Sequence, residues 1–274
     1  MVWWQAFVLG LTQGLTEFLP VSSSGHLALL QRLFGISSDG LLFFDIILHL
    51  ATLVAVCIIF WKDIVNLFKK PFRTLLYLVV ATIPAAIAGL LLHKFDVLDS
   101  KILGGKIIGV YLAVFFTVTA AVLFATEMFA KRRKRLYPLS FRTTLPMGFA
   151  QAMAILPGIS RSGSTIAAGT FSGGTTEEVS KFSFLMSIPI ILGSFVVELY
   201  SGLKDAGSIE TAFSVNPQFG WCIALGFIAA AVSGLFAIKV MLAAIKKADY
   251  KWFSIYLVLL AAVCLILQFT GCIN

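Results

Sequence analysis

Six long apolar stretches constrain the fold of this chain more than any other feature. A helix that crosses a bilayer needs about 20 mostly apolar residues, and inside lipid a single segment can satisfy its own backbone hydrogen bonds only as a helix. The stretches are residues 41–61, 74–93, 105–127, 182–202, 220–244 and 252–272. We therefore predict an all-α polytopic membrane protein in which residues 1–274 form a single integral membrane domain.

The scarcity of charged residues excludes several classes of soluble protein. Only 12% of the residues are charged and 59% are hydrophobic, whereas a soluble domain carries about 25% charged residues. An ordinary cytosolic protein, a disordered scaffold and a nucleic-acid-binding domain are therefore excluded. Basic loops at a membrane face explain the net charge of +8, so we expect membrane lipid, and no nucleic acid, as the partner of the surface.

Two further apolar stretches are broken. Residues 3–34 are interrupted at Pro20 and at the run 22–25, and residues 143–172 are interrupted at the run 157–164. Each half is too short to cross a bilayer, and irregular backbone at membrane depth survives only where protein or a water-filled cavity satisfies its polar groups. We predict two re-entrant helix hairpins, each of which enters and leaves on the same side.

The basic residues support this topology. If the hairpins are re-entrant, 14 of the 21 Lys and Arg residues fall in loops on one face, and five fall in loops on the other. The first face comprises the loops 62–73, 131–142, 177–181 and 246–251, and the second comprises the loops 27–40, 94–106 and 203–219. Because cytoplasmic loops carry the excess of Lys and Arg, we predict that the first face is cytoplasmic and that both termini lie outside.

The two broken stretches resemble each other at a constant offset of 138 residues. The run Gln13–Gly25 aligns without gaps on Gln151–Gly163, and Gly10 aligns with Gly148. Each half of the chain, 1–130 and 143–274, then contains one hairpin followed by three spans. Since three is odd, the second half must insert upside down, which predicts an inverted-topology repeat whose broken helices meet near the midplane.

Polar and ionisable residues gather in both hairpins. Ionisable groups inside a membrane are costly, so each one marks a candidate functional site. The first hairpin contributes Glu17, Ser22, Ser23, Ser24 and His26, and the second contributes Ser160, Arg161, Ser162, Ser164 and Thr165. If the hairpin tips meet, these residues form one pocket suited to a phosphate ester or anhydride.

The serine-rich runs are candidate phosphate-binding elements. Each run precedes a short apolar segment that looks helical, 27–33 or 166–170, and would cap its N-terminus, where free N–H groups and the helix dipole favour an anion. Two such ends facing each other would cradle a diphosphate. The candidate binding residues are Ser22, Ser24, Gly25, Ser160, Ser162, Gly163 and Thr165; for Ser22 and Ser162, a role as a cap alone explains the pattern equally well.

Four residues have types suited to catalysis. Arg161 offers a planar fork that binds phosphate bidentately and stabilises charge on a transferring phosphoryl group. Ser23 needs a base to become a nucleophile, and His26 lies three residues further on, on the same helical face if the turn is wound. Glu17 would orient that imidazole or hold a divalent cation.

These runs carry a family resemblance. The run Glu17-Phe-Leu-Pro-Val-Ser-Ser-Ser-Gly-His26 and the run Pro157-Gly-Ile-Ser-Arg-Ser-Gly163 resemble the two signature motifs of the undecaprenyl-diphosphate phosphatase family, also called the bacitracin-resistance family. The run 182–189 is similar to that family too, and the resemblance covers essentially the whole chain. It implies hydrolysis of the C55 isoprenyl diphosphate carrier lipid to its monophosphate for peptidoglycan synthesis, in the bacterial cytoplasmic membrane, at a site open to the outer face.

The resemblance also implies residue roles. Ser23 matches the nucleophile, His26 the acid/base, Arg161 the phosphate-binding arginine and Glu17 the second acidic residue of a Glu/Gln-x-x-x-Glu motif. The first position of that motif is Gln13, so a site with two carboxylates is not available. Mg²⁺ or Ca²⁺ would need Glu17, Gln13 and phosphate oxygens together. Ser22 or an activated water stays open as the nucleophile.

One pair of polar residues lies on the first span. Asp45 and His49 are spaced i, i+4, and we favour a hydrogen-bonded pair over a proton relay.

A lipid-phosphate transporter or flippase is the alternative function, because inverted repeats with broken helices are typical of transporters. Against it, only the first hairpin carries the Glu, Ser and His set. The sequence leaves a homo-oligomer open.

Overall fold

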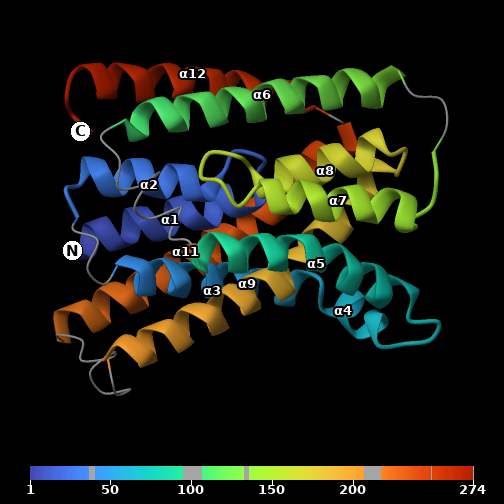
Figure 1. Cartoon of the computed structure of the whole chain (residues 1–274), viewed down its shortest axis with the longest axis horizontal. Coiled ribbons are helices and arrows are strands. Elements are labelled where there is room, and N and C mark those ends of the chain that lie inside the picture. The colour runs from blue at the N-terminus through green and yellow to red at the C-terminus, as the bar shows by residue number, and fades with distance from the viewer. Residues whose placement is uncertain (37–40, 95–106, 133–135, 207–216, 248, 274) are drawn as a thin grey trace.

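The computed structural model describes residues 1–36, 41–94, 107–132, 136–206, 217–247 and 249–273. These residues form eleven helices and no strand, apart from one isolated bridge between Tyr137 and Gly174. The helices are α1 (Trp3–Phe18), α2 (Ser23–Leu33), α3 (Leu41–Ile59), α4 (Trp61–Leu67), α5 (Arg73–Lys94), α6 (Ile108–Arg132), α7 (Phe141–Met153), α8 (Arg161–Phe171), α9 (Thr176–Ala206), α11 (Pro217–Lys247) and α12 (Lys251–Phe269). The predicted all-α membrane fold is confirmed (Figure 1).

Five of the described helices are long and apolar enough to cross a membrane, namely α5, α6, α9, α11 and α12. The remaining predicted span, 41–61, is not one straight helix. The helix α3 ends at Ile59, and the chain bends by 82° at Phe60 into the short helix α4. A sixth span is therefore obtained only if α3 and α4 are counted together. The first two residues of the predicted span 105–127 lie outside the described residues, as do the last three residues of the basic run at 131–135.

Both broken stretches fold as two short helices with a turn between them. The helices α1 and α2 contain 16 and 11 residues, and α7 and α8 contain 13 and 11. At 1.5 Å per residue none of the four reaches the ~30 Å thickness of the hydrocarbon core. The turns require unusual backbone, because Ser22 has φ +67° and Gly158 has φ +95°. The helix–turn–helix form of both hairpins is as expected, and their re-entry from one side of a membrane stays a prediction.

The first helix of each hairpin packs against a long helix of the other half. The helix α1 lies along α11 and α7 lies along α5, while α3 packs on α9 and α6 on α12. Two glycines allow the backbones to touch. A Cβ on Gly10 would lie 2.3 Å from Gly226 O, and one on Gly148 would lie 2.5 Å from Ala81 O. Gly10 and Gly148 are the pair matched by the offset of 138 residues, so the two halves interlock through equivalent close contacts.

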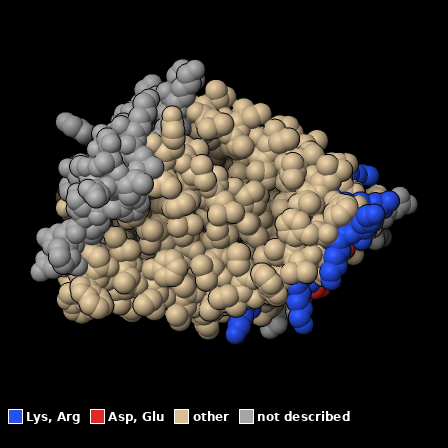
Figure 2. Space-filling view, turned by 90° about the horizontal axis from the view of Figure 1, so that it is seen from below, with Lys and Arg blue, Asp and Glu red and all other residues tan. Residues whose placement is uncertain are grey.

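The described basic side chains and the chain termini lie toward different ends of the helical bundle (Figure 1 and Figure 2). Both chain termini lie at one end (Figure 1), and on the face shown in Figure 2 the described Lys and Arg side chains gather at the opposite end. Between the two ends, the described surface in Figure 2 consists of residues other than Lys, Arg, Asp and Glu. The sides of the membrane on which the two ends lie stay a prediction.

Candidate active site

The tips of the two hairpins touch each other. The Gly158 N–H donates to Ser22 Oγ at 3.1 Å, and Ser162 Oγ donates to Leu19 O at 3.0 Å. The contact is close because Gly25 has no side chain: a Cβ there would lie 3.0 Å from Gly158 Cα. The meeting of the two predicted hairpin tips is therefore observed, and two hydroxyls hold it together.

A residue of α6 braces the second tip. Thr119 Oγ1 donates to Gly158 O at 3.0 Å and accepts a hydrogen bond from Ser160 N at 3.2 Å. Thr119 is 2% exposed, so both bonds lie in the interior, where an unpaired backbone group is costly. The turn that precedes Arg161 is therefore fixed from outside the hairpin.

The serine-rich runs lie inside the short helices rather than before them. The helix α2 begins at Ser23 and α8 begins at Arg161, so Ser24, Gly25, Ser162 and Gly163 belong to first turns. The prediction that each whole run precedes and caps its helix is therefore wrong in register. Ser160 alone caps as expected, since its Oγ accepts from Gly163 N at 3.1 Å. Ser22 makes no side-chain cap on α2, because its hydroxyl bonds to the other hairpin.

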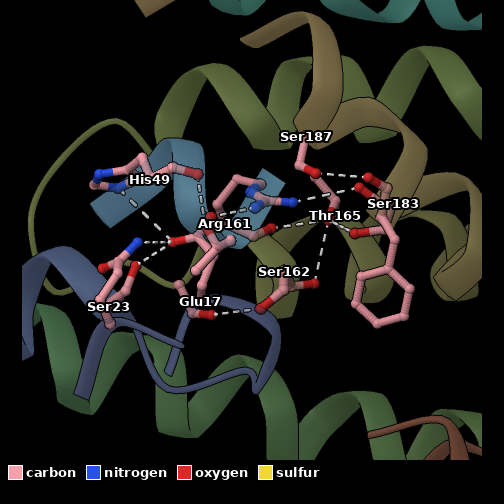
Figure 3. A network of polar contacts seen from close by, with 12 residues as sticks. Glu17, Ser23, His49, Arg161, Ser162, Thr165, Ser183 and Ser187 are labelled. Carbon is pink, nitrogen blue, oxygen red and sulfur yellow. Dashed lines mark hydrogen bonds and ion pairs between the residues drawn. The ribbon is translucent and has the colours of Figure 1, made fainter. Parts of the chain in front are cut away.

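Glu17 is the centre of a charged cluster (Figure 3). Its Oε1 accepts from Arg161 Nη2 at 2.5 Å. Its Oε2 accepts from Ser23 Oγ at 2.6 Å and from Gln13 Nε2 at 3.1 Å. Glu17 is 8% exposed, and a buried carboxylate persists only when it is paired and hydrogen-bonded. The structure thus brings together the predicted carboxylate, arginine and serine from both hairpins.

His49 of α3 joins this cluster, which the sequence did not predict. Its Nε2 lies 3.8 Å from Glu17 Oε2, and its Nδ1 lies 2.7 Å from the backbone oxygen of Asp45. The Asp45 carboxylate instead accepts from Gln31 Nε2, at 2.8 and 3.0 Å. The expected hydrogen-bonded pair of Asp45 and His49 is therefore formed, but through the backbone oxygen of Asp45 and not through its carboxylate. The i, i+4 spacing indicated that both residues lie on one face of α3, but not that His49 also reaches Glu17.

His26 does not contact Ser23. Its Nδ1 lies 2.7 Å from Ser22 O and its Nε2 lies 2.7 Å from the Tyr256 hydroxyl on α12. A carbonyl oxygen only accepts, so Nδ1 donates and, in the neutral ring, Nε2 accepts from Tyr256. The expected Ser23–His26 pair is not formed, because Ser23 turns toward Glu17 while the imidazole turns toward α12. Tyr256 is a second site residue that the sequence did not indicate.

Arg161 also contacts α9, at a residue whose hydroxyl is hydrogen-bonded to α8. Arg161 Nη1 donates to Ser183 O at 3.3 Å, and the hydroxyls of Thr165 and Ser183 lie 2.6 Å apart. Ser160 Oγ and Ser162 Oγ are 3.2 Å apart. A guanidinium has five N–H donors, so the two contacts to Glu17 and Ser183 leave donors for a phosphate. Ser183 belongs to the run 182–189 that carries part of the family resemblance.

The residues that would hold a cation are few. No group of three or more His, Cys, Asp or Glu side chains suited to a metal is present among the described residues. Gln13 is fully buried, and its Oε1 has no hydrogen-bond partner. An amide oxygen beside a carboxylate is a donor set that Mg²⁺ or Ca²⁺ accepts. Gln13 and Glu17 therefore fit part of a cation site, whose remaining ligands would have to come from substrate and water.

Comparison with known proteins decides the family. The model of the family described as bacitracin resistance protein BacA matches residues 6–263, a range that includes both hairpins and the Glu17–Arg161 pair. The chain belongs to the BacA family. The family resemblance predicted from the two motifs is therefore confirmed.

Curated members of the BacA family align with nearly the full chain. A protein of Carboxydothermus hydrogenoformans named undecaprenyl-diphosphatase is 42% identical over 97% of this chain and 98% of its own length. Proteins with the same name from Methanobrevibacter smithii and Bacteroides fragilis are 40% and 37% identical. They cover 92% and 98% of this chain, and 92% and 99% of their own lengths.

Proposed function

We infer that this chain is an undecaprenyl-diphosphatase, a hydrolase that converts the C55 isoprenyl diphosphate carrier lipid to its monophosphate and inorganic phosphate. The names of the BacA-family relatives support this activity, and they do not favour the alternative of a lipid-phosphate transporter. The observation that carries the proposal is the Ser23 hydroxyl, which donates to a buried carboxylate that is itself paired with Arg161. A hydroxyl, a proton acceptor and a phosphate-binding fork are the parts that phosphoryl transfer needs.

The proposed reaction begins when the terminal phosphate binds to the free donors of Arg161. Phosphate draws the guanidinium away from Glu17, so the carboxylate becomes a stronger base. Glu17 Oε2 takes the proton of Ser23, and Ser23 Oγ forms a bond to the terminal phosphorus. The bond from that phosphorus to the bridging oxygen breaks, and the lipid monophosphate leaves with the electron pair. Water then attacks the phosphorus of the phosphoserine, and the bond between Ser23 Oγ and phosphorus breaks. Glu17 returns its proton to Ser23 Oγ, and inorganic phosphate leaves with the oxygen and the protons of the water.

The contacts favour Ser23 over Ser22 as the nucleophile. The Ser22 hydroxyl accepts the Gly158 N–H, whereas the Ser23 hydroxyl donates to a carboxylate. We assign Ser22 and Ser162 to bracing the hairpin tips, since each bonds to backbone of the other hairpin. Ser24, Gly25, Ser160, Gly163 and Thr165 stay as proposed phosphate-binding residues at the two facing helix N-termini.

We propose the same site for a divalent cation. Glu17 and Gln13 would hold Mg²⁺ or Ca²⁺ together with phosphate oxygens, and the cation would neutralise charge on the diphosphate. The test is phosphate release by protein treated with chelator and then supplied with each cation in turn. Activity that survives thorough chelation would remove the cation from the proposal.

We propose that the basic end of the bundle faces the cytoplasm of a bacterial cell, with both termini and the opening of the site at the outer face of the cytoplasmic membrane. The basic loops and the position of the termini at the opposite end support this orientation. Labelling of single cysteines by an impermeant maleimide in intact cells tests it. A cysteine at position 33, in place of Leu33, should be labelled in intact cells. A cysteine at position 69, in place of Lys69, should be labelled only after lysis.

The activity itself is tested with purified protein in detergent. Wild-type protein should release inorganic phosphate from polyprenyl diphosphates, and substrates of different prenyl length measure the chain-length preference. The transporter alternative is tested with labelled lipid monophosphate in proteoliposomes. Phosphate release without translocation above protein-free liposomes would retain the hydrolase and discard the transporter.

A further inference from the structure

The side chain of His49 is held in place beside the catalytic carboxylate. Its Nδ1 lies 2.7 Å from the backbone oxygen of Asp45, one helical turn earlier on α3. This contact fixes the ring so that Nε2 faces Glu17 Oε2, at 3.8 Å (Figure 3). The two side chains are 32% and 7% exposed, respectively. His49 thus approaches a buried carboxylate from a partly open side of the cluster.

The orientation of the His49 ring determines which of its nitrogens faces Glu17. The Asp45 carbonyl only accepts, so Nδ1 carries a hydrogen. The ring is therefore oriented with Nε2, its other nitrogen, toward Glu17 Oε2.

The position of His49 has a counterpart in the other half of the chain. At the same offset of 138 residues, Asp45 corresponds to Ser183 and His49 to Ser187. Ser183 supports Arg161, because its backbone oxygen accepts from Arg161 Nη1 at 3.3 Å. Each partner of the Glu17–Arg161 pair is therefore contacted by the span that follows its own hairpin, Glu17 by α3 and Arg161 by α9.

We propose that His49 is a positioning residue that holds Glu17 Oε2 toward Ser23 when substrate phosphate draws Arg161 away from the carboxylate. The proposal rests on the proposed function, because it assigns His49 a role in the same reaction. Oε2 is the atom that accepts the Ser23 hydroxyl, and it is also the atom nearest His49. Once Arg161 binds phosphate and releases Oε1, the contacts from His49 and Gln13 to Oε2 still hold the carboxylate beside Ser23.

Two amide substitutions distinguish the contacts of the two imidazole nitrogens. In His49→Gln, the amide nitrogen lies near the position of Nε2 and can donate to Glu17. In His49→Asn, it lies near the position of Nδ1, so only the bond to the Asp45 carbonyl is kept. Both side chains are neutral, polar and smaller than histidine. A comparison of the two therefore tests the contact with Glu17 and not merely the presence of a polar group on α3.

The experiment measures kcat and KM for a polyprenyl diphosphate and the melting temperature in detergent for the wild type and both variants. We expect His49→Asn to lower kcat by about 10- to 100-fold with little change in KM, because misplacement of a reacting group acts on the transition state. His49→Gln should keep kcat within about threefold of the wild type, since it retains a donor to Glu17. Asp45→Asn is the control: its side chain contacts Gln31, its backbone oxygen still holds residue 49, and its activity should be unchanged.

Equal kcat values for His49→Asn and the wild type would overturn the proposal. So would an equal loss in both variants accompanied by an equal fall in melting temperature, since that result indicates packing alone. If the wild type releases no phosphate from any polyprenyl diphosphate, the proposed function fails and not the specific role of His49. The wild-type measurement in the same assay therefore distinguishes the two failures.

Discussion

Glu17 and Arg161, 144 residues apart in the chain, form a buried ion pair with 2.5 Å between Oε1 and Nη2. The pair joins the end of the first helix of one hairpin to the beginning of the second helix of the other. Neither charge is stable alone at this depth, because an unpaired buried ion costs several kcal/mol. Formation of the site and docking of the two hairpins are therefore one event.

The ion pair should contribute to both stability and activity. We expect Arg161→Ala to lose most phosphate release and to destabilise the protein by about 3–5 kcal/mol, because it leaves the Glu17 carboxylate buried without its cation. The double variant Glu17→Gln with Arg161→Met should be more stable than Arg161→Ala while it remains inactive. Thermal unfolding in detergent and phosphate release measure the two effects. Full activity of Arg161→Ala would contradict the proposed mechanism.

The neighbouring serines should differ in function. Ser23→Ala should abolish phosphate release and leave the melting temperature within a few degrees, because the hydroxyl bonds to Glu17 and not to backbone of the other hairpin. Ser22→Ala should keep activity and lower the melting temperature, since it leaves the Gly158 N–H without its partner.

Rapid-quench experiments with substrate labelled in the terminal phosphate extend this comparison. A phosphoserine that forms in the wild type and is absent from Ser23→Ala is the expected result. Substantial turnover by both serine variants would instead indicate direct attack by water.

His26 and Tyr256 should behave as a coupled pair. The imidazole Nε2 and the phenol oxygen lie 2.7 Å apart, and both atoms link α2 to α12. Tyr256→Phe and His26→Ala should each reduce activity, and the double variant should lose less than the product of the two effects, with a coupling of about 0.5–1.5 kcal/mol. Ser22→Ala combined with Tyr256→Phe serves as the reference for an uncoupled pair, because Ser22→Ala should keep activity and its lost hydroxyl bonds to Gly158 and not to Tyr256. Strict additivity for His26 and Tyr256 would show that their contact has no role in the reaction.

Much of the architecture followed from the sequence because lipid restricts the backbone so severely. The long apolar stretches had to be helices, and Pro20, Pro157 and Gly158 marked the places where helices had to break. The meeting of Glu17 and Arg161 in one site was predicted for a related reason, although their direct ion pair was not. Glu17 and Arg161 are ionisable residues in apolar surroundings, and such residues need a partner.

The residues that the sequence missed are those whose role depends on how helices pack. His49 was expected to form a hydrogen bond with Asp45, and it does, but packing of α3 beside α1 also brings its ring to Glu17. Tyr256 and Thr119 lie in ordinary-looking spans, and only the position of those spans brings them to His26 and to the Gly158 turn. The bend at Phe60 has no proline or glycine within α3 to announce it.

The close contact between α1 and α11 gives the last prediction. A Cβ on Gly10 would lie 2.3 Å from Gly226 O, and the nearest atom is backbone that cannot turn aside. Gly10→Ala should therefore separate the two helices and destabilise the protein by about 1–3 kcal/mol. Gly89→Ala on α5 is the matched control, because its Cβ would meet only the end of the Ile155 side chain at 3.9 Å. Alanine is the better helix former by about 1 kcal/mol, so this control should melt at or above the wild-type temperature. Melting curves of Gly10→Ala and Gly89→Ala in one detergent measure the difference. Equal stability of the two variants would contradict the close approach of α1 and α11.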